Sequence, residues 1–426
     1  MLLLLLIILF YLLCEYRCYK TCITPFFIIG IIYFVSVPFI NIVGPKLGYF
    51  KISNDTIYMF MLYLSLIFFS DIVFKICMVQ NKVRHYKDNA YDYYNEMFVK
   101  QQKIIWYTFV VFLIGYSLSF FEAVNIYGIS AIKGKSNGIF GHMGLACISI
   151  SPLIVLLLIK TRKIKYFFGI ISLFMIMLLF GGKTYIFIAI ITSGILLNIE
   201  YQFNFSKLVK LGLLFIILAI SIFIIIYTLI PCISTGNMDI TTMKSYARES
   251  MQHIFYYFAS PFLSSNSYFN MPLKEGFITG IRIMFAPIVS IYELLFGNKN
   301  YPHIIMTEWA PISESAHRTV TNVGGLFSES VFHIGYLYSF LYVLLICFYV
   351  NIIYFINKKT NHFSGSTSLA ISLLGLCFFV NYFMLLVVLE MIIYLMLFEV
   401  FLLILYQKKI YIKDWRFKRT WKNIRL

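Results

Sequence analysis

The sequence predicts an all-α polytopic integral membrane protein with about 11 transmembrane helices and one large extracytoplasmic loop. Hydrophobic residues make up 61% of the 426 residues and charged residues only 12%, whereas soluble domains are about half apolar and about a quarter charged. Runs of about 20 apolar residues, long enough to cross a hydrocarbon core of roughly 30 Å, recur along almost the whole chain. Much of the protein surface is therefore expected to contact lipid.

The apolar runs define the expected spans, of which eight precede the long loop and three follow it. We interpret residues 1–14 as a short first span that is retained. A cleavable signal peptide would begin with basic residues and carry small residues before the cleavage site. This segment begins MLLLLLIILF with no basic residue, and Leu13 is too bulky for a lipoprotein cleavage site before Cys14. The expected spans are 1–14, 22–43, 56–79, 104–125, 138–159, 166–182, 184–199, 211–231, 330–356, 367–384 and 387–406.

The distribution of lysine and arginine predicts the orientation of these spans. The chain has 35 basic and 18 acidic residues, a formal charge of +17. If the tail 407–426 is cytoplasmic, twenty-three of the 35 basic residues fall on the cytoplasmic side, eleven fall outside and Lys75 lies within a span. Basic loops stay on the cytoplasmic side of membranes. We therefore attribute the positive charge to orientation in the lipid bilayer and expect no nucleic acid partner.

This orientation divides the chain into four regions. We expect N-terminal transmembrane helices in 1–231, a large periplasmic loop in 232–329, C-terminal transmembrane helices in 330–406 and a basic cytoplasmic tail in 407–426. The loop segment 276–296 is long enough to cross the membrane, but a crossing there would move strongly basic segments outside. A helical re-entrant or interfacial segment is therefore expected.

The motifs of soluble nucleotide-dependent and metal-dependent enzymes are absent. The sequence contains no phosphate-binding Gly-Lys-Ser/Thr loop, no dinucleotide fingerprint and no His-Glu-x-x-His. Cys14, Cys18 and Cys22 are four residues apart, but no set of histidines or carboxylates completes a ligand sphere around them. We expect neither a metal site nor a cofactor.

Candidate functional side chains concentrate near the end of the long loop, which reads SESAHRTVTNVGGLFSESVFHIGYLYSF. Fixed cations can neutralise a departing diphosphate without a metal, and a histidine or carboxylate can accept the proton of an attacking hydroxyl group. The main diphosphate-binding candidates are Arg318, which ranks first because it lies in the motif-like stretch, and Arg282, with support from Arg248 and, in the turn GGKTY, Lys183. The preferred base is His317, with Glu314 and Glu329 as alternates. The competing interpretation is that these are solvated loop residues and that Lys183 is an ordinary snorkelling lysine.

Charged residues inside the expected spans are a second set of candidates. Asp71 and Lys75 are four residues apart and are expected to pair on one helical face. Glu122, Glu390 and Glu399 are weak indications of a proton path.

Three stretches resemble motifs of one enzyme family, the Wzy-type O-antigen (oligosaccharide repeat-unit) polymerases. They are FGGKTYIFIAI, FYYFASPFLSS at 255–265 and RTVTNVGGLFSESVFHIGYLYSF. The sequence departs from the family pattern at Lys183, where arginine is common, and at His333, where Asp or Asn is often found.

The resemblance implies a metal-independent glycosyltransferase in the bacterial inner membrane. Such enzymes join undecaprenyl-diphosphate-linked oligosaccharide repeat units into O-antigen, or capsular polysaccharide, at the periplasmic face, as a step in lipopolysaccharide biosynthesis. A repeat-unit flippase and a chain-length regulator are the partners implied.

Other functions stay open on the sequence. An O-antigen ligase shares most of these features and transfers to the lipid A core instead. A flippase or other transporter is disfavoured by the single long loop, and a scaffolding component of a polysaccharide assembly complex would need no active site.

Overall fold

The computed structural model describes residues 1–80, 97–128, 138–180, 182–203, 239–271, 277–296, 309–316 and 318–423, with isolated positions between 206 and 237. Eight described helices are long and apolar enough to cross a membrane, which confirms the predicted fold class. They are α1 (Leu2–Tyr19), α2 (Pro25–Val43), α3 (Asn54–Gln80), α5 (Gln102–Tyr127), α6 (Gly138–Thr161), α8 (Lys183–Tyr201), α13 (Leu326–Thr360) and α15 (Leu386–Asn423). Two further apolar helices are shorter, α7 (Ile164–Leu179) and α14 (Ser364–Leu376).

Ten of the eleven expected spans thus coincide with helices of the described chain, although the boundaries differ. The expected span 211–231 lies mostly outside the described residues. The largest difference concerns the expected span 367–384, because α14 already ends at Leu376. A non-helical stretch with one short 3-10 turn, η3 (Tyr382–Met384), follows before α15 begins.

The chain forms two compact units that are not continuous in sequence. The first unit comprises 1–81, 201–352 and 370–389, and the second comprises 82–200, 353–369 and 390–426. α13, α14 and α15 each pass from one unit into the other. Hydropathy along the chain cannot show this grouping, because it depends on which helices pack together.

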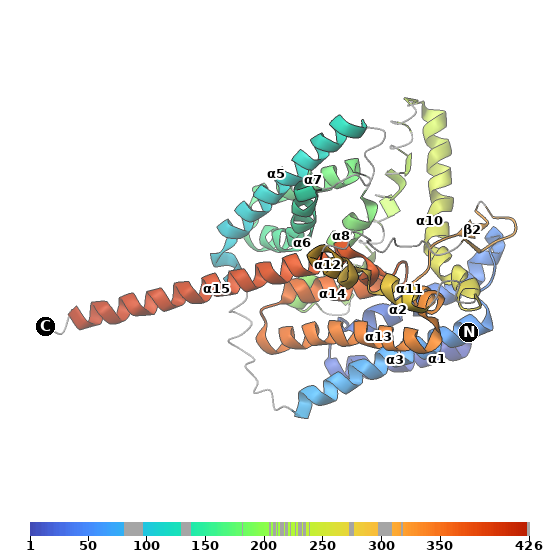
Figure 1. Cartoon of the computed structure of the whole chain (residues 1–426), viewed down its shortest axis with the longest axis horizontal. Coiled ribbons are helices and arrows are strands. Elements are labelled where there is room, and N and C mark those ends of the chain that lie inside the picture. Colours follow the sequence, from blue (N-terminus) through green and yellow to red (C-terminus); the bar gives the residue numbers. More distant parts are fainter. Residues whose placement is uncertain are drawn as a thin grey trace. The chain divides into compact units, whose positions relative to one another are not determined.

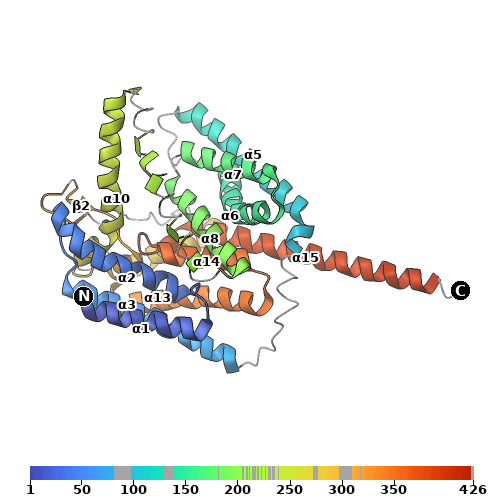
Figure 2. The ribbon, with the colours of Figure 1, turned by 180° about the vertical axis from the view of Figure 1, so that it is seen from behind.

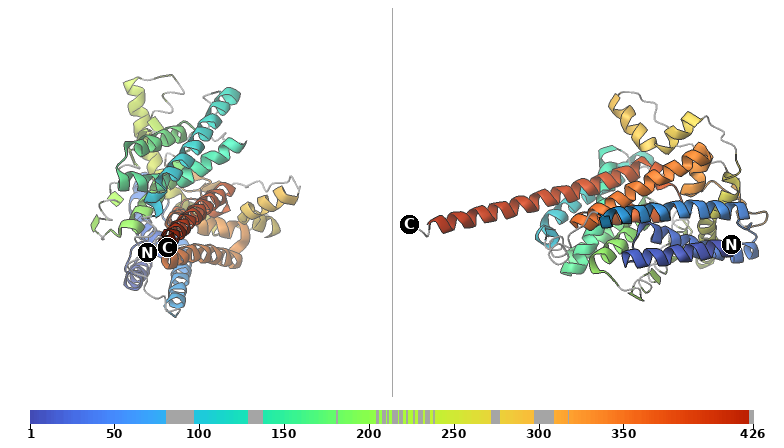
Figure 3. Two further views of the ribbon diagram at one scale, coloured as in Figure 1. Left: turned by 90° about the vertical axis from the view of Figure 1, so that its left-hand side faces the viewer. Right: turned by 90° about the horizontal axis from the view of Figure 1, so that it is seen from below.

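The core of the first unit is a bundle of α1, α2, α3 and the first part of α13, which lie side by side (Figures 1 and 3). Aromatic rings fill the space between α3 and α13: Tyr63 stacks on Phe340, and Phe74 meets Phe348 edge to face. α2 begins where its sequence predicts, because Thr24 accepts the amide of Phe27 and proline occupies the first helical position.

The expected periplasmic loop contains a long helix, α10 (Ile240–Tyr268). It runs across the axes of the bundle helices, near the end of the bundle at which Met1 lies (Figures 1 and 2). Its second half packs onto the bundle, where Phe262 meets Tyr33 and Phe60 edge to face. Its first half is mostly exposed. Because α10 is not among the helices apolar enough to span, it follows the bilayer surface if α1, α2 and α3 cross the bilayer.

The segment 277–296 is not one continuous helix. It forms α11 (Phe277–Met284) and α12 (Ala286–Phe296), which are 8 and 11 residues long and are separated at Phe285. At 1.5 Å per residue the longer one reaches only about 17 Å, which is too short to cross a hydrocarbon core. Ile278, Leu295 and Phe296 are exposed, as expected for short helices that contact lipid from one side.

A two-stranded ribbon, β1 (Ala310–Pro311) and β2 (Val320–Thr321), joins the long loop to the α2–α3 connection. Tyr49 pairs with Ser313 in an antiparallel bridge, and the amide of Phe50 donates to the carbonyl of Ile312 at 2.9 Å. We call the surface formed by residues 44–53, α10 and the ribbon 310–321 the loop face of the first unit. An even number of expected spans separates the α2–α3 connection from the long loop 232–329, so both are expected on the same side of the membrane. In the structure these two segments contact each other.

Candidate functional site

Arg318, which precedes β2 on the loop face, is an exposed cation held by an aromatic ring. Its guanidinium carbon lies over the ring of Tyr256 on α10, 5.1 Å from the ring centroid. Tyr256 is buried and donates its hydroxyl hydrogen bond to the carbonyl of Val320 at 3.3 Å. No carboxylate forms an ion pair with Arg318 in the part of the chain that the structure describes. The guanidinium is therefore oriented by its contact with the ring, while its N–H groups stay available to an anion.

The groups around Arg318 are aromatic rather than acidic. Tyr49 packs against Phe255 with ring centroids 5.2 Å apart. Burial raises the pKa of the Tyr49 phenol, nearby Tyr256 adds to this, and the Arg318 charge opposes it. The tyrosine-rich stretch 255–265 thus forms the support on which Arg318 rests. A dry aromatic support with one exposed cation suits a ligand that is anionic at one point and carries apolar or sugar surface beside it.

The glycines that follow Arg318 have packing and conformational roles. A Cβ atom on Gly325 would lie 2.5 Å from the carbonyl oxygen of Phe378, so only glycine allows this approach. Gly335 adopts φ 72° and interrupts α13, a conformation that other L-residues rarely take. These two positions explain why the family-like motif TNVGG…HIG contains glycine there.

Arg282 is placed differently from Arg318, although both are loop arginines. Its guanidinium binds the carboxylate of Glu293 at 2.9 Å and so links α11 to α12. The Glu293 side chain is only 3% exposed, so the charge of Arg282 already has a buried counter-ion. The Arg282 side chain is 54% exposed, but its charge is already balanced, which makes it a weaker candidate for the diphosphate. The structure thus adds a reason to rank Arg318 first.

The two remaining predicted cations, Arg248 and Lys183, have no described contact with Arg318. Arg248 is exposed on α10, eight residues before Tyr256, which is about 12 Å along the helix axis. Lys183 is the first residue of α8 and belongs to the second unit. The side chain of Lys183 lies outside the described part of the structure, so its proposed role is unchanged.

The three predicted bases differ in position. Glu314 is exposed between β1 and β2, and His317 lies outside the described residues. Glu329, which the sequence places at the end of the long loop, is not a solvated loop residue: it is 4% exposed and accepts the backbone amide of Asn381 at 3.0 Å. The Gly324 backbone also lies close to its carboxyl group.

Glu329 instead stabilises the interruption between α14 and α15. The amide of Leu326 donates to the carbonyl of Cys377 at 2.7 Å, and the side-chain amide of Asn381 donates to the hydroxyl of Tyr342 at 3.3 Å. Backbone groups freed by a broken helix at membrane depth must find partners within the protein. Glu329 and the start of α13 supply them, which explains why α14 can end early.

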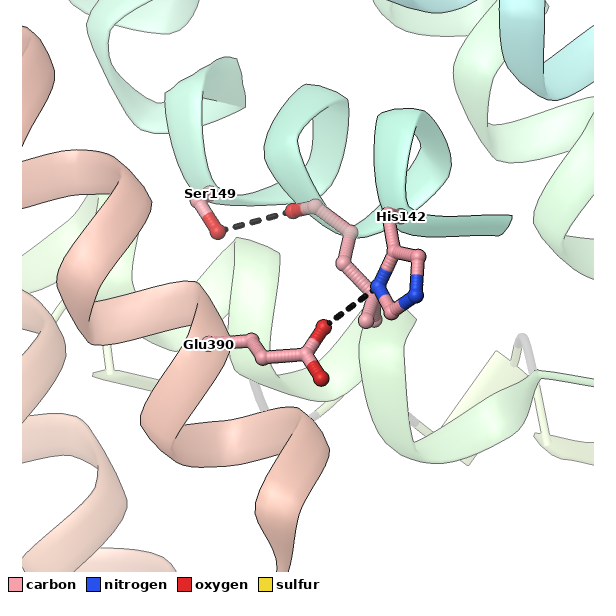
Figure 4. A network of polar contacts seen from close by, with 4 residues as sticks. His142, Ser149 and Glu390 are labelled. Atoms are coloured by element: carbon pink, nitrogen blue, oxygen red, sulfur yellow. Dashed lines mark hydrogen bonds and ion pairs between the residues drawn. The ribbon is translucent and has the colours of Figure 1, made fainter. Parts of the chain in front are cut away.

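Carboxylates of the second unit also have local partners. Glu399, which is completely buried, accepts the amides of Gly365 at 2.8 Å and Ser366 at 3.1 Å and thereby caps α14. Glu390 on α15 binds Nδ1 of His142 on α6 at 2.8 Å (Figure 4). Sequence reasoning did not select His142, because its partner is 248 residues away and no local pattern links them. These pairings give both glutamates a structural role that the proton-path hypothesis did not consider.

We expect Glu399→Ala to lower the stability of the protein by about 2 kcal/mol, because the first amides of α14 would lose their acceptor in a buried position. Thermal unfolding in detergent measures this change. Glu399→Gln, which keeps one carbonyl oxygen, should lose less. The exposed Glu122 on α5 gives a control, since Glu122→Ala is expected to change stability by about 0.5 kcal/mol or less. Equal effects at both positions would contradict the capping role.

The described residues define a multi-pass helical membrane protein with a cationic, aromatic site on a structured loop. No protein-family model, curated protein or solved structure matches the chain. Among the described residues, no group of three His, Cys, Asp or Glu side chains is arranged to hold a metal ion.

Proposed function

We propose that this protein is a metal-independent glycosyltransferase of the O-antigen polymerase type. It would join oligosaccharide repeat units carried on undecaprenyl diphosphate at the periplasmic face of the bacterial inner membrane. The single observation that carries the proposal is Arg318, an oriented and exposed arginine on the loop face with no acidic partner in the described chain. The motif resemblance supports the substrate class, and the charge distribution supports a periplasmic loop face.

The chemistry follows from the charge of the leaving group. A hydroxyl oxygen of the acceptor sugar forms a bond to the anomeric carbon of the donor chain, and the bond from that carbon to the diphosphate oxygen breaks. The electron pair leaves with the diphosphate, whose growing negative charge Arg318 can neutralise through a two-point contact. The hydroxyl proton passes to a base, for which His317 and Glu314 are the candidates.

The supporting cations are those that the sequence suggests, but Arg282 moves from second place to last because Glu293 balances its charge. Arg248 and Lys183 are the further candidates for contacting the diphosphate, followed by Arg282. The bilayer holds the polyprenyl chains of donor and acceptor. A repeat-unit flippase would supply the substrate, and a chain-length regulator would act on the product.

Deleting the gene is expected to leave lipid A core that carries at most one repeat unit, because the units would still be made, moved across the membrane and attached, but not joined. Electrophoresis of lipopolysaccharide from the deletion strain, with and without the gene restored, measures this.

Any other lipopolysaccharide pattern of the deletion strain would indicate a different function. An unchanged ladder of long chains contradicts the proposal. Core without even a single unit indicates a ligase, and repeat units that accumulate on the cytoplasmic face indicate a flippase.

A further inference from the structure

A buried polar cluster lies in the first unit at the end of the bundle where α1 ends and α2 begins. Glu15 of α1 and Asp71 of α3 are both completely buried there. Glu15 interacts electrostatically with Asp71 and with Lys75, which is one turn after Asp71 on α3. The loop face is at the other end of α1, since α1 begins next to Met1 and Glu15 is about 20 Å further along its axis.

Asp71 has the environment of an ionised carboxylate. One oxygen accepts the amide of Phe26 at 2.7 Å, and the other accepts the side-chain amide of Asn351 at 2.6 Å. The amide of Phe26 belongs to the first turn of α2, where the helix dipole favours negative charge. The pair with Lys75 that the i, i+4 spacing predicts is replaced by these bonds, because two N–H donors point directly at the carboxylate.

Glu15 has none of these stabilising contacts. Neither carboxyl oxygen has a hydrogen-bond partner among the residues that the structure describes. The Thr24 side chain lies beside it, but no hydrogen bond of good geometry joins the two. The ammonium of Lys75 lies over the ring of Tyr19, 4.8 Å from the centroid.

The charges in this cluster do not balance. If both carboxyl groups were ionised, two negative charges would face one ammonium group in a dry environment, and an uncompensated buried charge costs several kcal/mol. The other titratable groups around the pair are Tyr19 on α1 and Cys347 on α13, which are neutral in their ordinary protonated forms. One further positive charge is therefore required within the described cluster.

We infer that Glu15 binds an exchangeable proton and that Asp71 is its ionised neighbour. The proton is the smallest cation that removes the imbalance, and Glu15 is the carboxyl group whose oxygens have no donor. Binding and release of this proton would link the packing of α1, α2 and α3 to the proton concentration at this end of the bundle. This inference does not depend on the proposed glycosyltransferase activity, in which no proton crosses the membrane.

An apolar carbodiimide tests the inference, because dicyclohexylcarbodiimide modifies protonated carboxyl groups in apolar surroundings. The purified full-length protein in detergent is treated with this reagent over a range of pH, and the peptide that contains Glu15 is examined by mass spectrometry. We expect modification of Glu15 at low pH, falling as the pH rises by up to about tenfold per pH unit once the carboxyl ionises. Asp71→Asn, which removes the neighbouring negative charge and keeps an acceptor oxygen, should move this decline to lower pH.

The same digest contains an internal control. Glu200 is also buried, but it forms an ion pair with Lys160 at 3.3 Å, so it should stay unmodified. Absence of modification at Glu15 over the whole pH range, or equal modification of Glu15 and Glu200, would overturn the inference. If sodium but not potassium protected Glu15 from modification, the bound cation would be a sodium ion and the inference of a proton would be wrong. Thermal unfolding of Asp71→Asn checks that this variant is folded.

Discussion

Arg318→Ala is expected to lower the rate of chain elongation by about 10²–10³-fold, the usual cost of losing a charge contact made in the transition state. The guanidinium carbon lies over the Tyr256 ring, 5.1 Å from its centroid, and has no carboxylate partner among the described residues. Arg318→Lys should retain part of the rate, because an ammonium group supplies the charge but not the planar two-point contact. The measurement is the length distribution of lipopolysaccharide at matched protein level, followed by the rate of transfer between lipid-linked repeat units in reconstituted vesicles.

Arg162 provides the matched control. It is an exposed arginine in the connection between α6 and α7 of the second unit, and Arg162→Ala should leave the ladder of long chains unchanged. A normal ladder from Arg318→Ala would remove the proposed diphosphate role. A reduced ladder from both variants would indicate a general effect of lost positive charge on membrane insertion.

Glu329→Ala is expected to destabilise the protein by about 3 kcal/mol, because the amide of Asn381 would lose its acceptor in a buried place. The stretch between α14 and α15 would then have unsatisfied backbone groups at membrane depth. Unfolding in detergent, by heat or by titration with sodium dodecyl sulfate, measures the loss. Elongation activity should fall in parallel with the amount of folded protein.

Glu329→Gln distinguishes this structural role from the alternate role as a base. Glutamine keeps a carbonyl oxygen that can accept the Asn381 amide, but it cannot accept a proton at neutral pH. We expect Glu329→Gln to retain most of the stability and most of the activity. If Glu329→Gln were as stable as the wild-type protein but inactive, Glu329 would be the base and the structural explanation would be wrong.

Local sequence predicts the helices well, because each one has to be apolar along its own length. The start of α2 illustrates this: Thr24 and Pro25 are adjacent in sequence and act on the same first turn. The break after Leu376 is different, since the run 367–384 is mostly apolar and its hydropathy does not mark a helix end there. The helix ends there because Glu329 and Leu326, about 50 residues earlier in the chain, provide partners for a non-helical backbone.

In the candidate site, too, the sequence predicts which residues are present and the fold decides which neighbours they have. Sequence alone placed three of the four candidate cations for an anionic substrate in the loop 232–329 and ranked Arg318 first by its motif, but it could not show how Arg318 and Arg282 differ in their surroundings. The difference between them depends on neighbours, since Arg318 rests on Tyr256 while Arg282 is neutralised by Glu293.

The sequence by itself determined that this is a helical multi-pass membrane protein, because the need to match apolar segments to lipid acts on each segment separately. Only the tertiary structure decided what its buried polar groups do. Asp71 binds Asn351, Glu399 caps Ser366 and Glu390 binds His142 across 280, 33 and 248 residues of chain. A buried charge takes whichever donor the fold brings within about 3 Å, and distance along the sequence does not predict that donor.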